Sequence, residues 1–156
     1  MDTVQPLKVK KVLIVLLLSL VTLGLYNSYW YINQLDGLNS LKSNEKLDKN
    51  VFMGCLISYI FGVIFMVLSL FYDEGTELYK TYDGISAVLY YVPMFILIFQ
   101  SFKIKRILND HFNVDLNYNI SFSNLAVFFF WFYYLQYKIN RIIKKASLGI
   151  STSVIE

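Results

Sequence analysis

Few side chains in this sequence could carry out catalysis or hold a metal. There is one histidine, His111, and one cysteine, Cys55. The histidine follows Asn109-Asp110 in a segment typical of a turn, and the cysteine lies inside an apolar stretch, where a thiol usually packs as a small buried group. We find no phosphate-binding loop, dinucleotide fingerprint or nucleophile elbow. We therefore expect no catalytic residue, no metal site and no cofactor, in a protein that is not an enzyme.

A stripe of small residues lies in the second long apolar stretch of the chain. Gly54, Ser58 and Gly62 are spaced by four. Small residues let two helices approach closely, and close packing holds helices together in lipid. The stripe therefore indicates a helix-packing surface. We expect it to pack inside the monomer, and the alternative is a seam between two copies.

A few polar residues interrupt the other apolar stretches. They are Ser19, Thr22, Asn27 and Gln136, with Asn140 just beyond the last stretch. Side-chain amides and hydroxyls in a bilayer form hydrogen bonds between helices. We expect that role for these residues, and the alternative is that they line a polar path. The apolar stretches contain no ionisable residue of the kind that ion-coupled transporters usually need.

Aromatic residues gather where the first and last apolar stretches end. The residues concerned are Tyr26, Tyr29, Trp30, Tyr134 and Tyr137. Amphipathic rings are favoured at the headgroup level, so we expect an aromatic belt at the membrane interface. An aromatic box that binds a ligand is the alternative.

The elements that must position these residues are helices in a membrane. Charged residues make up only 16% of the chain, against about 25% in a typical soluble protein. They lie in bands between four stretches without Asp, Glu, Lys, Arg or His, at residues 12–35, 50–72, 84–102 and 116–137. About 20 apolar residues cross a bilayer as a helix, and a charge at its centre costs at least ~2.5 kcal/mol. The net charge of +3, without a basic run interleaved with aromatics, argues against a nucleic-acid partner.

We therefore predict one domain, 1–156, with an all-α fold: an integral membrane bundle of four transmembrane helices. The helices are expected over about 12–34, 50–72, 84–107 and 121–145. Thr22-Leu23-Gly24 could loosen the first helix, and Pro93 should kink the third, because proline removes the hydrogen bond to the carbonyl of Leu89. The fourth stretch begins with polar residues; we expect it to span, and the alternative is a partly interfacial helix.

The orientation follows from the distribution of cations. Four spans would place both termini on one side with eight Lys and Arg residues, and six would lie on the other side. The positive-inside rule then favours cytoplasmic termini in a multi-pass protein of the cell membrane.

Two short motifs resemble a known family. Thr22-Leu23-Gly24-Leu25-Tyr26 runs into Tyr29-Trp30-Tyr31, and Tyr134-Leu135-Gln136-Tyr137-Lys138-Ile139-Asn140 follows near the C-terminus. Both are similar to motifs of the small bacterial membrane proteins grouped as domain of unknown function 4234. The resemblance implies a multi-helix bacterial membrane protein and brings no activity with it.

The functional prediction is a non-enzymatic multi-pass membrane protein that acts through helix–helix contacts, as an accessory subunit, scaffold or regulator. Its expected partners are the lipid bilayer and either a second copy or another membrane protein. The alternative is a small oligomeric permeation protein, transporter-like or holin-like, whose path is lined by the polar residues above. Immunity to a membrane-active toxin is a third hypothesis, which the sequence does not separate from the first.

Overall fold

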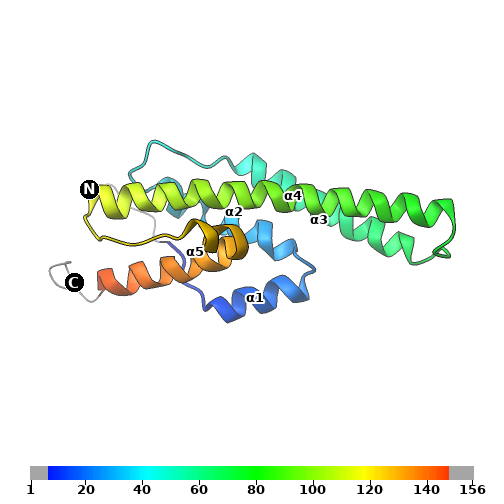
Figure 1. Ribbon diagram of the computed structural model, residues 1–156, viewed down its shortest axis with the longest axis horizontal. Helices are drawn as coiled ribbons and strands as arrows, with labels where there is room; N and C mark the ends of the chain where they lie inside the picture. Colours follow the sequence, from blue (N-terminus) through cyan, green and yellow to red (C-terminus); the bar gives the residue numbers. More distant parts are fainter. Residues whose placement is uncertain (1–6, 148–156) are drawn as a thin grey trace.

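The computed structural model of the protein describes residues 7–147. These residues form five α-helices and a short π-helix without any β-strand, so the all-α prediction is confirmed. The elements are α1 (Val12–Val21), α2 (Leu25–Asn39), α3 (Lys49–Ser69), α4 (Glu77–Asn109), η1 (Asp110–Asp115) and α5 (Asn124–Ser147). Figure 1 shows α3 and α4 side by side as a long hairpin, with α1, α2 and α5 gathered along one half of it.

The molecule has two regions that differ in burial. The half of the hairpin that extends past the other helices, residues 60–89, is named the arm here, and the rest of the described chain is the body (Figure 1). Every hydrophobic side chain of the buried core belongs to the body, and the largest are Trp30, Tyr31, Tyr59 and Phe52. The buried residues of the arm are all small: Gly62, Ser69 and Ser86.

Two helices in the described part of the chain are long and apolar enough to cross a membrane. They are α3 and α4, the latter continuing through η1 to give a segment over Glu77–Asp115. Only 22% of the most apolar window in each is buried inside the structure. Most of each apolar window therefore lies on the surface of the protein.

Both hairpin helices begin at side-chain caps. Asp48 accepts a hydrogen bond from the backbone N–H of Asn50 at 2.8 Å, and Thr76 accepts one from Tyr79 N–H at 3.2 Å. Such caps satisfy donors that a helix start leaves open. The start of α3 lies close to the predicted one. The start of α4 lies well before residue 84, because its cap is inside the charged segment.

The first apolar stretch is broken into two helices. Leu23 and Gly24 have positive φ angles of 49° and 86°, and the hydroxyl of Thr22 accepts the N–H of Tyr26 at 3.0 Å. Glycine adopts this left-handed conformation without steric cost, and the threonine caps the new helix. The loosening predicted at Thr22-Leu23-Gly24 is present as a full break, so the single helix predicted over 12–34 is a helical hairpin. With 10 residues, α1 is only ~15 Å long, about half the thickness of the hydrocarbon core.

The fourth apolar stretch is broken as well. Trp131 has φ 30° and ψ −113°, which separates a short segment at 124–130 from a longer one at 132–147. Residues 116–123 before it are mostly irregular. The predicted helix over 121–145 is therefore kinked, and its second half carries Lys138, Arg141, Lys144 and Lys145. Because α5 is not among the candidate spans of the described chain, the predicted bundle of four spanning helices is not established.

Pro93 lies inside α4 without ending the helix. Proline has no N–H to give to the carbonyl of Leu89. The hydroxyl of Ser58 in α3 donates to that carbonyl at 2.9 Å. A second bond of the same kind runs in the opposite direction, from the Ser86 hydroxyl in α4 to the Gly62 carbonyl at 2.9 Å. The two hairpin helices are thus joined by paired serine–carbonyl bonds as well as by packing.

Candidate functional site

Four side chains at the centre of the body form one connected polar cluster, the amide clamp, made of Trp30, Gln34, Gln136 and Asn140. Trp30 Nε1 donates to Gln136 Oε1 at 2.6 Å, and Gln34 Nε2 donates to the same oxygen at 3.2 Å. Gln136 Nε2 donates in turn to Asn140 Oδ1 at 2.7 Å. The clamp joins α2 to α5 across 106 residues of sequence.

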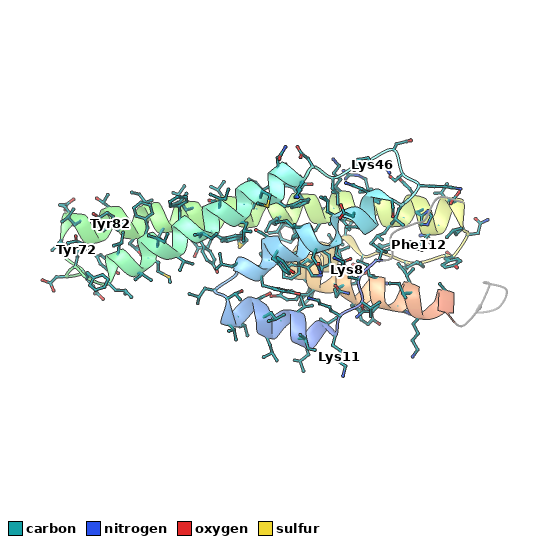
Figure 2. All side chains as sticks on the ribbon, turned by 180° about the vertical axis from the view of Figure 1, so that it is seen from behind. Lys8, Lys11, Lys46, Tyr72, Tyr82 and Phe112 are labelled. Atoms are coloured by element: carbon teal, nitrogen blue, oxygen red, sulfur yellow. The ribbon has the colours of Figure 1, made fainter. Side chains whose placement is uncertain are left out.

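The clamp also holds the extended segment that precedes α1. Lys8 N–H donates to Gln34 Oε1 at 2.9 Å, and Gln34 Nε2 donates back to the Lys8 carbonyl at 2.7 Å. The Lys8 carbonyl accepts a further bond from Gln136 at 3.1 Å, and the Lys10 carbonyl accepts one from Asn140 at 2.7 Å. Lys8 is labelled in Figure 2. The Lys8 N–H and the carbonyls of Lys8 and Lys10 are therefore bonded by amide side chains, much as a neighbouring strand would bond them in a sheet.

The chemistry of the clamp is hydrogen bonding without charge. Gln34 and Gln136 are both buried, and a buried amide left without partners costs about 1–3 kcal/mol. The cluster therefore fixes the relative position of three segments rather than activating a substrate. Trp30, Gln136 and Asn140 come from the two motifs that resemble a family, so the two ends of the chain that carry the resemblance meet here.

The polar residues predicted inside the apolar stretches do not form one group. The hydroxyls of Ser19 and Thr22 donate to carbonyls four residues earlier, at 2.9 and 2.7 Å. Gln136 belongs to the amide clamp, and Asn27 lies beside the turn between α1 and α2. These four residues therefore line no common path within one copy of the chain.

The turn between α1 and α2 contacts the middle of α4. Tyr90 of α4 donates its hydroxyl to the Leu23 carbonyl at 2.7 Å, and its ring meets Tyr59 edge-to-face at 5.0 Å. Two buried polar atoms near this contact, Asn27 Oδ1 and the Tyr59 hydroxyl, have no hydrogen-bond partner among the described residues. The contact fixes the position along α4 at which the turn between α1 and α2 lies.

The stripe of small residues is divided between two environments. Ser58 and Gly62 lie in the contact between α3 and α4, where a Cβ on Gly62 would approach the Cβ of Leu89 to 3.5 Å. Gly54 is exposed, and a Cβ there would have no neighbour within 4 Å. Two members of the stripe therefore pack inside the monomer, and the third presents a small residue on the outer surface of α3.

The residues predicted for an aromatic belt are also divided. Tyr29 and Tyr137 are exposed, and Tyr134 is half-buried. Trp30 and Tyr26 are buried in the protein instead, because α2 turns back into the body and is covered by its neighbours. Trp30 packs against Phe132 with 5.4 Å between ring centroids. Trp30 therefore belongs to the core and the amide clamp, and it is not exposed as a residue of an interfacial aromatic belt would be.

Two important residues of the body were missed by sequence reasoning. Tyr31 donates its hydroxyl to the Leu97 carbonyl at 3.0 Å and lies 2.6 Å from the Ser101 hydroxyl. Gln34 supplies three of the clamp's bonds. The signal that could have revealed them is the high polar content of residues 26–34. A lipid-facing helix would not tolerate it, so it indicates a helix packed against other protein segments.

Comparisons with family models, with curated proteins and with solved structures gave no match. The resemblance to the domain of unknown function 4234 family therefore stays a prediction. Among residues 7–147, no group of three or more His, Cys, Asp and Glu side chains is placed to hold a metal ion.

Proposed function

We propose that the protein is a non-enzymatic membrane protein with two spanning helices, α3 and α4, that acts through contacts between the outer face of α3 and another helix in the bilayer. The exposed apolar surface of α3 and α4 is the observation that carries this proposal, and the arm shows it most clearly. Its large side chains point outward, and Phe61, Val88 and Leu70 are among the exposed ones. With 21 residues, α3 is ~31 Å long, which matches a hydrocarbon core of about 30 Å.

The distribution of cations supports an orientation. With α3 and α4 as the only spans, thirteen of the 14 Lys and Arg residues lie on the body side, and Lys80 lies on the side of the arm's tip. The tip carries Asp73, Glu74, Glu77 and Asp83. The positive-inside rule then supports a cytoplasmic body and an external tip far more strongly than the eight-to-six division of four spans.

The helical hairpin of α1 and α2 fits this arrangement as a re-entrant element. Its turn contacts Tyr90, which lies 13 residues, or ~20 Å of helix, before Lys103 on α4. The outward face of α1 is apolar, with Leu13, Leu20 and Val21 exposed. Lys8, Lys10 and Lys11 precede it at the body end. The hairpin would therefore enter the bilayer from the cytoplasmic side and return to it.

The contact hypothesis is better supported than the permeation alternative. Three of the four polar residues that a path would need already form hydrogen bonds within the protein: Ser19 and Thr22 bond within the helical hairpin, and Gln136 belongs to the amide clamp. The outer face of α3 offers Gly54 with open space around it, flanked by the exposed Ile57. Such a site accepts a closely packed helix of a partner.

The orientation can be tested by cysteine labelling. Cys55 is replaced by alanine, and a single cysteine is placed at Gly75 in the tip or at Asn44 in the body. A membrane-impermeant maleimide applied to intact spheroplasts is expected to label the Gly75→Cys variant only. Labelling of both variants, or of Asn44→Cys alone, would contradict the proposed topology.

The contact itself can be tested with a photo-crosslinking amino acid at Ile57. A crosslinker at this position is expected to give one discrete protein adduct. A crosslinker at Val88, on the exposed face of α4, serves as the control for contact with lipid alone. An adduct with a second copy only would favour the oligomeric alternative. The absence of any protein adduct from Ile57 would overturn the contact hypothesis.

A further inference from the structure

Lys138 of α5 is a buried cation without an acidic partner among residues 7–147. Its exposed fraction is 8%, and its ammonium group donates to the Ser121 carbonyl. The same group lies 5.7 and 5.3 Å from the ring centroids of Phe122 and Tyr134. A carbonyl and two ring faces supply only partial negative charge. None of the ion pairs within residues 7–147 includes Lys138, although buried charges are normally paired.

A cavity of about 170 Å³ opens beside this ammonium group. Its lining comes from the irregular segment before α5 and from one face of α5: Asn119, Ile120, Ser121, Lys138, Arg141, Ile142 and Lys145. The three cations lie at spacings of three and four, so they share a helix face. No acidic residue lines the cavity, and neither Arg141 nor Lys145 forms an ion pair within the described chain.

The segment of α5 that precedes the kink at Trp131 is apolar and exposed. The short segment 124–130 of α5 exposes Leu125, Phe128, Phe129 and Phe130. These side chains suit acyl chains, and the cations further along α5 lie at the body end of the helix, where the proposed topology puts the cytoplasmic headgroups. Positive charge next to an exposed apolar surface is the pattern that an anionic amphiphile would complement.

We propose that this cavity binds the headgroup phosphate of an anionic phospholipid from the cytoplasmic leaflet. The phosphate would supply the negative charge that Lys138 lacks, and the exposed Arg141 guanidinium can present two N–H groups to one phosphate. Basic pockets on the cytoplasmic side of membrane proteins bind such headgroups. The inference rests on the proposed orientation and is independent of any protein partner.

The test counts lipids that remain bound to the full chain in native mass spectrometry. Purified protein in detergent is mixed with dioleoyl-phosphatidylglycerol or with dioleoyl-phosphatidylcholine. The wild type is expected to retain one phosphatidylglycerol in preference to phosphatidylcholine. The double variant Arg141→Gln, Lys145→Gln should bind it roughly thirtyfold more weakly, since each cation contributes to headgroup attraction. Lys138 is left unchanged, because its removal would also disturb packing against Phe122 and Tyr134.

The matched control removes two body-side cations outside the cavity, in the variant Lys49→Gln, Lys103→Gln. Equal loss of lipid in both double variants would overturn the proposal in favour of general surface charge. Displacement of the lipid by equimolar sn-glycerol 3-phosphate would overturn it in favour of a soluble phosphate ligand. Where the double variant does not fold, the single variant Arg141→Gln is used, and lipid retention equal to the wild type contradicts the site. The cysteine labelling described above tests the orientation of the protein, and the number of bound lipids tests the cavity, so either proposal can fail without the other.

Discussion

The arm and the body are built from helices of the same chain, yet they are held together in different ways. In the body, large aromatic side chains such as Trp30, Tyr31 and Phe132 are buried and touch one another. In the arm, α3 and α4 approach through the small residues Gly62 and Ser86, and the large side chains face outward. The body therefore has a conventional hydrophobic core. The contact between α3 and α4 is instead a narrow line of small residues, and it is called the seam here.

In the proposed topology, this difference follows from the medium around each region. Apolar side chains gain nothing by leaving lipid, so helices in a bilayer associate through close packing and short polar bonds. A body with connections to the aqueous side can bury large rings and satisfy buried amides within itself, as the clamp does. Substitutions of matched size should consequently cost far more in the body than in the arm.

The largest expected effect is the loss of the central ring of the body. Trp30→Ala removes a fully buried indole and leaves Gln136 Oε1 without its closest donor, so we expect unfolding in detergent to be easier by about 3–5 kcal/mol. The matched change in the arm, Phe61→Ala, should cost less than ~1 kcal/mol, because that ring faces outward. Denaturant titration by circular dichroism measures both, and equal losses would refute the distinction between core and seam.

The amide clamp should come next. Gln136→Leu keeps the side-chain volume but leaves the buried indole N–H of Trp30 and the amide of Asn140 without this partner. An unsatisfied buried polar group costs about 1–3 kcal/mol. We also expect residues 7–11 to become open to proteolysis, since Gln136 helps to hold the Lys8 carbonyl. Unchanged stability together with unchanged proteolysis would show that the clamp does not fix the segment.

The two ends of the small-residue stripe, the exposed Gly54 and the buried Gly62, should respond differently to substitution by leucine. Gly62→Leu forces α3 away from Leu89 and is expected to cost about 1–3 kcal/mol, as overpacking does. Gly54→Leu has open space and should leave stability unchanged while weakening the crosslink from Ile57. Thermal unfolding and crosslinking, measured on the same two variants, separate packing inside the monomer from packing with a partner. A stability loss at Gly54 equal to that at Gly62 would contradict this assignment.

The hairpin of α3 and α4 was more accessible to sequence reasoning than the helices packed against it. Charge-free windows, the small-residue spacing and Pro93 each describe one helix and its nearest neighbour, which is all that a seam requires. The existence of α3 and α4 follows from those local signals. The main difference from the prediction is the start of α4, which lies before residue 84 because Thr76 caps the helix inside a charged segment.

The body depends on contacts that no local pattern contains. The motif Thr22-Leu23-Gly24 predicts a weak point in the first apolar stretch, but the full break there is stabilised by Tyr90 from a distant helix. The kink at Trp131 occurs in a run of aromatic residues without glycine or proline. The amide clamp joins residues 106 apart in the chain. Tertiary packing, rather than composition, decides each of these features.

The smallest effect tests the seam itself through a double-mutant cycle. Ser58→Ala removes the hydroxyl that donates to the Leu89 carbonyl and should cost about 0.6 kcal/mol, the average for a hydrogen bond between membrane helices. Pro93→Ala restores a backbone N–H that can donate to the same carbonyl within α4. In the Pro93→Ala background, the Leu89 carbonyl therefore has a partner without the Ser58 hydroxyl.

The cost of Ser58→Ala should then fall toward zero when Pro93 is absent, and the difference between the two backgrounds is the coupling energy of serine and proline. Unfolding in mixed micelles of dodecyl sulfate gives all four stabilities. Ser86→Ala supplies the matched control, because its hydroxyl donates to the Gly62 carbonyl of α3, remote from the proline. Its cost should be the same in both backgrounds. Equal coupling for Ser58 and Ser86 would mean that the proline acts on the whole seam through helix bending rather than through one freed carbonyl.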